Sequence, residues 1–228
     1  MKVTLQHLTK KFPNRNKKAG GDVVAVNDFT FEIPDGKLIG LLGPSGCGKS
    51  TALNLISGLL EPTAGQIFFG EDDVTHLPPE NRGVGLVFQN YALYPHLTVR
   101  QNIMFPLENL RGADKLTKAE MAERTLAAAK LVQLEGLMDR KPSELSGGQQ
   151  QRVAIARALI AKPDVIFADE PTGNLDSQSG REVMDLLASV HREFGKTIVV
   201  ITHDDRIAQM AERKFSIVDG ILSEVSRR

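Results

Sequence analysis

Two separate segments of the sequence suit a phosphate group, and this pair constrains the fold more than any other feature. Residues 43–50 read Gly-Pro-Ser-Gly-Cys-Gly-Lys-Ser, the pattern of a phosphate-binding loop between a strand and a helix. Residues 145–149 read Leu-Ser-Gly-Gly-Gln and offer a second set of backbone N–H groups at the start of another predicted helix. One triphosphate cannot easily occupy two cradles on one small domain. The pair therefore favours two chains that face each other head to tail around a shared nucleotide.

Short apolar blocks alternate with helical stretches along the chain, which is typical of an α/β fold with a parallel sheet. Four blocks predict short, fully buried strands, and the alternating segment Val24–Ile33 predicts a half-buried strand. A helix with an apolar stripe is predicted from about Lys49 to Ser57. The buried strands are predicted at Leu38–Leu42, Val84–Phe88, Val165–Ala168 and Thr197–Ile201.

A long helical segment without an adjacent strand breaks this rhythm between Thr117 and Gln133. Thr117 and Glu120 form the pattern of a capping box, which marks the start of a helix. We therefore predict a helical subdomain that is inserted into the α/β core of one domain. The predicted boundaries are about 91–145 for the subdomain, about 1–90 and 146–228 for the core, and 1–228 for the whole domain.

Composition narrows the classes of partner. The chain has 28 basic and 28 acidic residues, so its charge balance predicts no nucleic-acid partner. The single cysteine, Cys47, cannot form an internal disulfide, which fits a reducing compartment. The apolar runs are far shorter than the roughly 20 residues that cross a bilayer, and the N-terminus lacks the apolar block of a signal peptide. We expect no direct membrane insertion, so a role at a membrane would need partner subunits. The polar, basic stretch Pro13–Asp22 predicts a mobile surface loop.

The residue types near the first phosphate segment indicate a chemistry. Its glycines let backbone N–H groups turn towards a β-phosphate, while Lys49 can reach the β- and γ-phosphates and the Ser50 hydroxyl is placed for Mg²⁺. The apolar strand at 165–168 is followed by Asp169 and Glu170. Asp169 can hold Mg²⁺ through water, and Glu170 can orient a water against the γ-phosphorus. A solvated acidic turn is the alternative interpretation of these two carboxylates.

With these motifs the chain resembles the ATP-binding subunits of ABC transporters, whose signature motif is Leu-Ser-Gly-Gly-Gln. The resemblance covers nearly the whole chain, and the motifs occur in the family's order. It implies an α/β fold: a P-loop NTPase core with a mostly parallel sheet, an antiparallel β region near the N-terminus and an inserted helical subdomain. ATP and Mg²⁺ are the implied cofactors. The motifs are, in order, Phe12, the phosphate loop, Gln89, the signature, Asp169-Glu170, Asn174–Asp176 and His203.

The resemblance also implies a role for each motif. Glu170 would be the catalytic base, and His203 would contact the γ-phosphate. The metal would be held by Ser50, Gln89 and Asp169. The nucleotide would contact Phe12, through the adenine, and Gly43, Pro44, Ser45, Gly46, Cys47, Gly48, Lys49, Ser50 and Thr51. The ATP of the opposite subunit would contact Leu145, Ser146, Gly147, Gly148 and Gln149. A loop that crosses between subunits would contain Asn174, Leu175 and Asp176.

Four of these assignments are weak when each is taken alone. Gln89 follows a strand, where a glutamine is usually a surface residue, and a histidine such as His203 is more often structural there. The segment Asn174–Asp176 is also a plain helix-starting turn with Asp176 as its cap. Phe12 could instead belong to the core.

We expect an energy-coupling subunit: ATP closes a dimer of these domains, hydrolysis opens it, and attached membrane permease subunits move. The second ATPase subunit would be another copy or a paralogue, on the cytoplasmic face of the cell membrane. One alternative is an ABC ATPase that drives a non-transporting membrane partner in cell division or cell-wall regulation. The other is a soluble ABC ATPase. DNA-repair types divide the domain with hundreds of coiled-coil residues, whereas a few dozen separate Gln89 from Leu145, and translation-factor types carry two such domains.

Two segments give conflicting signals about the direction of transport. Residues 171–177 resemble the branch that serves lipoprotein release, macrolide-type export and cell-division partners. Residues 91–99, Tyr-Ala-Leu-Tyr-Pro-His-Leu-Thr-Val, resemble sugar and polyamine importers. Such importers usually carry a regulatory domain after the ATPase, whereas this sequence stops at Arg228. Direction and substrate therefore stay open at this stage.

Overall fold

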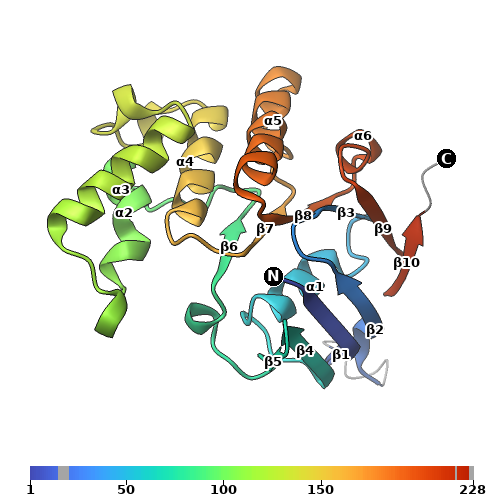
Figure 1. Ribbon diagram of the computed structural model, residues 1–228. Helices are drawn as coiled ribbons and strands as arrows, with labels where there is room; N and C mark the ends of the chain where they lie inside the picture. Colours follow the sequence, from blue (N-terminus) through green and yellow to red (C-terminus); the bar gives the residue numbers. More distant parts are fainter. Residues whose placement is uncertain (15–20, 219, 226–228) are drawn as a thin grey trace.

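The computed structural model describes residues 1–14, 21–218 and 220–225. In this part of the chain, two sheets are surrounded by helices (Figure 1). The strands are β1 Val3–Phe12, β2 Val23–Ile33, β3 Leu38–Leu42, β4 Ala64–Phe69, β5 Asp72–Asp73, β6 Val84–Val87, β7 Val165–Asp169, β8 Thr197–Thr202, β9 Arg213–Val218 and β10 Ile221–Val225. The α-helices are α1 Lys49–Ile56, α2 Val99–Glu108, α3 Lys118–Leu131, α4 Gly147–Leu159, α5 Ser177–Phe194 and α6 Asp205–Ala208.

The larger sheet has the order β10-β9-β3-β8-β7-β6 and is parallel except for its edge strand β10. Every residue of β8 is buried, as are four of the five residues in β3 and in β7. A parallel sheet covered on both faces needs apolar side chains throughout, which explains the continuous apolar runs. The four predicted buried strands are confirmed, with ends that differ by one residue at β6, β7 and β8.

Side chains of the larger sheet alternate between two cores, one on each face. Ile198 and Val200 belong to the core that contains residues of α2, α3, α4 and α5. Val199 and Ile201 belong to the core that contains residues of α1 and of the smaller sheet. The larger sheet is thus the middle layer, and the ends of its strands are held rigidly from both sides.

The smaller sheet has the order β2-β1-β4-β5 and is antiparallel. In β2, three buried residues alternate with more exposed ones, which confirms the predicted half-buried strand. The fold class is therefore as expected, α/β with a mostly parallel sheet and an antiparallel region near the N-terminus. Most of the loop predicted at Pro13–Asp22 lies outside the described residues, because 15–20 are not among them.

The chain between β6 and β7 is helical, and α2 and α3 lie beside α4 on the left of Figure 1. Thr117 caps α3: its hydroxyl accepts a hydrogen bond from Glu120 N at 3.3 Å, and the Glu120 carboxylate accepts one from Thr117 N at 2.7 Å. The predicted capping box is confirmed. The boundaries of a helical subdomain at about 91–145 stay a prediction. Among the described residues, no helix is long and apolar enough to cross a membrane.

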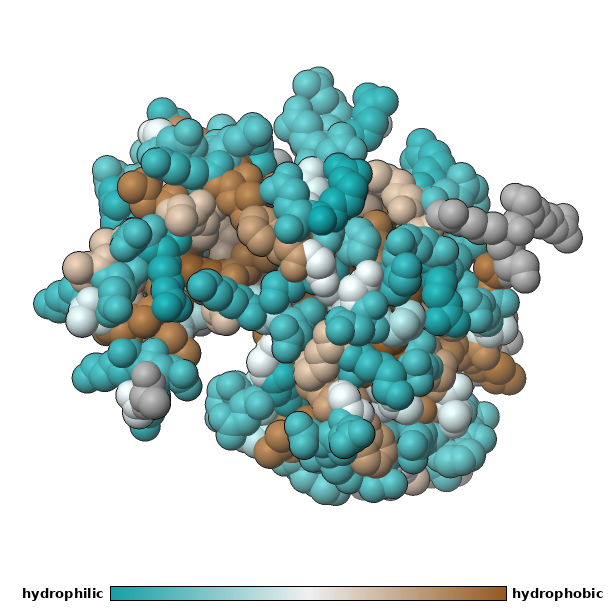
Figure 2. Space-filling view, viewed as in Figure 1, coloured by the Kyte–Doolittle hydropathy of each residue, from teal (hydrophilic) through white to brown (hydrophobic). Residues whose placement is uncertain are grey.

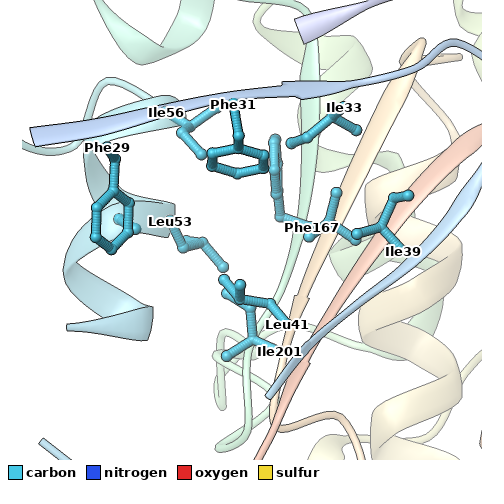
Figure 3. A pocket seen from close by; sticks show the side chains of 11 residues that line it. Phe29, Phe31, Ile33, Ile39, Leu41, Leu53, Ile56, Phe167 and Ile201 are labelled. Atoms are coloured by element: carbon cyan, nitrogen blue, oxygen red, sulfur yellow. The ribbon is translucent and has the colours of Figure 1, made fainter. Parts of the chain in front are cut away.

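A small void lies between α1, β2 and the larger sheet (Figure 3). It is lined by apolar side chains such as Phe29, Leu53 and Phe167, and its volume is about 10 Å³. That volume is about one water-sized sphere, and an apolar void of this size stays dry. We therefore interpret it as tightly packed core beneath the phosphate loop and not as a ligand pocket.

Candidate nucleotide-binding and catalytic site

The phosphate loop joins the end of β3 to the start of α1. Gly46 and Gly48 have φ values of +83° and +103°, a region that favours glycine. A Cβ on Gly48 would lie 2.2 Å from the Ala25 carbonyl oxygen, so the loop also needs glycine for space. No described side chain caps α1. Its first N–H groups and its positive end are therefore available to an anion.

Lys49 is folded back over this loop. Its Nζ donates hydrogen bonds to the carbonyl oxygens of Gly43 at 2.7 Å and Pro44 at 2.8 Å, and the residue is buried. The loop thus holds a cation where a phosphate would enter. The Cys47 thiol is also buried, with Sγ 3.8 Å from Lys49 Nζ, and it packs among core side chains. Cys47 therefore faces protein, and its backbone is the part left for a nucleotide.

Ser50 and Asp169 meet beside the loop, as the sequence predicts for two metal-holding residues. The Ser50 hydroxyl donates to Asp169 Oδ1 at 3.2 Å. Burial is the main cause that raises the pKa of Asp169, and Glu170 raises it further, while Ser50 and Lys49 act against this. Hydroxyl and carboxylate oxygens are the donors that Mg²⁺ prefers, and a cation would offset the cost of the buried carboxylate. These two residues therefore fit a magnesium ion.

Glu170 lies just past β7, held by the neighbouring strand. Its N–H donates to the Ile201 carbonyl at 2.9 Å, and its φ is +46°, which is uncommon outside glycine. The Glu170 carboxylate is within reach of His203, with Oε1 2.8 Å from Nδ1. The Glu170 side chain is 14% exposed and that of His203 61%. The two predicted catalytic residues are thus in direct contact at the mouth of the site.

Gln89 contacts Asn174 in this structure. Asn174 Nδ2 donates to the Gln89 carbonyl at 3.0 Å, and Gln89 Nε2 lies 3.5 Å from Asn174 Oδ1. The sequence analysis placed Gln89 with the metal, and that role stays a prediction because its described bonds go to Asn174. Asp176 caps α5 by accepting from the N–H groups of Gln178 and Ser179. These bonds, led by those from Ser179, lower the pKa of Asp176.

The signature segment begins α4, as predicted. Ser146 Oγ accepts from Gln149 N at 3.3 Å, and Gln149 Oε1 accepts from Ser146 N at 3.0 Å, which makes a capping box. Leu145 is buried. A Cβ on Gly147 would lie 2.8 Å from the Tyr91 hydroxyl, and one on Gly148 would lie 3.1 Å from Ser179 Cβ. Both positions therefore need glycine because neighbouring segments approach closely.

Phe12 ends β1, opposite Val23 in β2. Ala25, two residues further along β2, contacts the phosphate loop at Gly48, so the Phe12 end of the smaller sheet flanks that loop. The Phe12 ring is partly buried and lies 5.3 Å from Lys10 Nζ. Its predicted contact with adenine is neither supported nor opposed by these contacts.

Sequence reasoning missed three residues that organise the site. Thr202 is buried, and its hydroxyl lies 3.4 Å from Glu170 Oε2. Gln151 is fully buried and donates to the Pro171 carbonyl at 2.9 Å. Arg157 donates to the carbonyls of Tyr91 and Ala92. These contacts join segments far apart in the chain, so no local pattern could have revealed them. The apolar strand that ends in Thr202 was the one available signal.

Residues 26–173 of this chain match the family model described as ABC transporter. The chain belongs to the ABC transporter family. It is 44% identical over 225 residues to the xylose/arabinose import ATP-binding protein of Haloferax volcanii, which covers 98% of this chain and 56% of that protein. It is also 44% identical over 211 residues to the maltose/maltodextrin import ATP-binding protein of Salmonella typhimurium, with 92% and 56% covered. The chain therefore spans little more than half the length of these two relatives.

Solved structures give the same result for the fold. The dimeric structure of a bacterial ABC transporter cassette matches with a TM-score of 0.85 and 36% identity over 99% of this chain and 100% of that chain. A dimeric post-hydrolysis state of the same cassette, bound to ADP and Pi, matches with a TM-score of 0.84 and 36% identity, over 99% and 100% of the two chains. By family and by fold, this chain is an ABC ATPase cassette.

Proposed function

We propose that this chain binds and hydrolyses MgATP as the energy-coupling subunit of an ABC transporter. The observation that carries the proposal is the meeting of four predicted residues, Ser50, Asp169, Glu170 and His203, through two direct contacts. They follow the carboxyl ends of β3, β7 and β8, which are neighbours in the sheet. In open α/β sheets, ligands bind in the crevice at this edge.

The residues divide the reaction between them. The loop N–H groups and Lys49 bind the β- and γ-phosphates, and Ser50 with Asp169 would hold Mg²⁺, which when bound neutralises charge on the phosphate oxygens. Glu170 accepts a proton from the attacking water. The water oxygen bonds to the γ-phosphorus while the bond from phosphorus to the bridging oxygen breaks, which gives ADP and phosphate. His203 holds the Glu170 carboxylate from the solvent side through its 2.8 Å contact.

A second ATPase subunit would complete the site. The signature segment lies at the start of α4, whereas the phosphate loop precedes α1, and each offers backbone donors to phosphate. In a head-to-tail dimer, Ser146 and Gly147 of one copy would contact the γ-phosphate held by Lys49 of the other. The dimeric cassette to which this chain is similar supports that arrangement.

A membrane permease would bind near residues 91–97, and we propose uptake as the direction. Tyr94 is 37% exposed beside Phe105, and on the face shown in Figure 2 hydrophobic side chains gather over the helices on the left. Apolar surface of this kind commonly marks a partner site. Uptake is supported by the importer-like segment at 91–99 and by relatives that are themselves import ATP-binding proteins.

Replacing Glu170 with Gln tests the proposal. The change keeps the shape of the side chain and removes the base, so we expect MgATP turnover to fall by about 10²–10⁴-fold while binding persists. Because hydrolysis reopens the pair, the variant should accumulate as an ATP-bound dimer in size-exclusion chromatography, whereas wild type returns to monomer. The exposed Glu193, changed to Gln, is the matched control and should behave as wild type.

Two outcomes would contradict the proposal at different points. Wild-type turnover in Glu170→Gln would show that Glu170 is not the base. A wild-type chain that neither binds nor hydrolyses MgATP would overturn the ATPase function itself.

A further inference from the structure

Two consecutive residues at the end of β8 lie against the two oxygens of the Glu170 carboxylate. His203 Nδ1 lies 2.8 Å from Oε1, and Thr202 Oγ1 lies 3.4 Å from Oε2. The His203 side chain is 61% exposed, whereas Thr202 is 1% exposed. One carboxylate oxygen is therefore approached from the solvent side and the other from the protein interior.

The direction of the Thr202 hydroxyl proton follows from its neighbours. Thr202 Oγ1 accepts a hydrogen bond from Asp204 N at 3.0 Å. Its own proton needs an acceptor, because a buried polar group left unpaired is costly and this residue is closed to bulk water. Among the hydrogen bonds of the described residues, Glu170 Oε2 is the acceptor in range. The proton therefore points to the catalytic carboxylate.

Thr202 is also tied to the phosphate loop. Its carbonyl oxygen accepts a hydrogen bond from Gly43 N, the first residue of that loop, at 3.3 Å. One residue thus contacts both the base and the segment that would hold the phosphates. Glu170 itself has an uncommon positive φ, and a conformation of that kind persists when several contacts determine it together.

We propose that Thr202 is a positioning residue for ATP hydrolysis, an inference that rests on the proposed function. Its hydroxyl fixes the plane of the Glu170 carboxylate, and its carbonyl sets the distance between that carboxylate and the phosphate loop. Small displacements of a catalytic group are expensive in rate, because reaction needs the attacking water, the base and the phosphorus in line. Thr202 would thus act on the rate of hydrolysis and not on the binding of MgATP.

The same strand supplies a matched control at its other end. Thr197, the first residue of β8, is fully buried, and its hydroxyl accepts from Gly36 N at 2.9 Å and lies 3.5 Å from Asp35 Oδ1. Thr197 and Thr202 therefore have the same side chain, the same strand and the same kind of partners. They differ in whether the carboxylate is the catalytic one.

The test compares Thr202→Val, Thr202→Ser and Thr197→Val for melting temperature, MgATP affinity and kcat. Removing one hydrogen bond to a carboxylate predicts a loss of about tenfold in kcat for Thr202→Val, with MgATP affinity within about twofold of wild type. Thr202→Ser keeps the hydroxyl and should restore kcat. Thr197→Val should lower the melting temperature to a similar extent while kcat stays at the wild-type value.

A double variant separates positioning from general damage. If Thr202 acts through Glu170, adding Thr202→Val to Glu170→Gln should not slow the residual turnover further. Wild-type kcat in Thr202→Val, an equally slow Thr202→Ser, or a further tenfold loss in the double variant would each overturn the inference. Absence of MgATP turnover in the wild-type chain would instead contradict the proposed function and would leave these comparisons without a starting rate.

Discussion

The helices behind the two phosphate-contacting segments begin in different ways. Helix α1 follows glycines with positive φ and has no described side-chain cap. Helix α4 follows Ser146, which forms reciprocal hydrogen bonds with Gln149. The first helix therefore has open N–H groups and the buried ammonium of Lys49 beside them. The second has already used part of its polar groups on itself, and residues 145–149 contain no charged side chain.

This difference indicates an order of binding. A segment with open donors and a cation can hold a triphosphate in a single chain, since both terms favour an anion. The signature segment offers less, but the hydroxyl of Ser146 accepts its capping bond and still has a proton to donate. We therefore expect nucleotide to bind the phosphate loop first and the signature of the second copy to close over it afterwards.

Replacing Ser146 with Arg gives the largest expected break between the two segments. Introduced into Glu170→Gln, the bulky cation would enter the space between the copies, so the ATP-bound dimer should disappear from size-exclusion chromatography. The phosphate loop of the same chain is untouched, so MgATP should still bind the monomer with an affinity within about twofold of Glu170→Gln. The matched control is Ser189→Arg, at a partly exposed position on α5 away from the signature.

Equal loss of nucleotide binding and of the dimer in Ser146→Arg would contradict the division of roles. It would mean that the two segments of a single chain act on the same nucleotide.

Asp169→Asn sharpens the comparison through stability. Burial raises the pKa of Asp169 above its ordinary value of 3.8, so the ionised form is costly in the folded chain without metal. We expect Asp169→Asn to raise the melting temperature of the metal-free protein at neutral pH by about 2–4 °C, which corresponds to about 1 kcal/mol for a chain of this size. Turnover that depends on Mg²⁺ should be lost. The exposed Asp185, changed to Asn, is the control and should leave both unchanged.

The sign of the pH dependence follows from linkage. With its pKa raised on folding, Asp169 binds more protons in the folded than in the unfolded state just above pH 3.8, so its contribution to stability falls as pH rises through the folded pKa. Below the unfolded pKa the carboxyl is protonated in both states. The stabilisation by Asp169→Asn should therefore shrink as the pH is lowered towards about 4. A constant difference at every pH would show that desolvation of this carboxylate is not the cause.

How far the sequence could predict the molecule depended on the range of each interaction. Local patterns gave the strands, the Thr117 capping box and the pairing of Ser50 with Asp169, because strand ends of a parallel sheet meet at one edge. The contact of His203 with Glu170 follows from the same geometry. Contacts across many elements were out of reach. Nothing local in α4 shows that Arg157 would turn to the carbonyls of Tyr91 and Ala92.

Residues 91–97 provide the smallest expected effect on the isolated chain. Their backbone is held independently of their own side chains, because the buried Asn102 amide bonds to Tyr94, Leu97 and Thr98. Tyr94→Ala together with Leu97→Ala should therefore leave the loop in place. We expect kcat within about twofold of wild type and a melting temperature lower by only a few degrees, since the lost contact is mainly the packing of Tyr94 on Phe105 at 4.5 Å between ring centroids.

The same double variant should matter when a membrane partner is present. If the exposed Tyr94 side chain is part of the permease contact, co-purification with permease subunits encoded beside this gene should fall sharply, along with ATP-driven uptake into vesicles that contain the complex. Leu126→Ala on α3 is the control, because Leu126 is 40% exposed and Tyr94 37%, yet Leu126 lies outside residues 91–97. Unchanged assembly and uptake in the double variant would place the permease contact elsewhere. An equal loss in Leu126→Ala would mean that the contact extends across α3, so the helical side as a whole would face the partner.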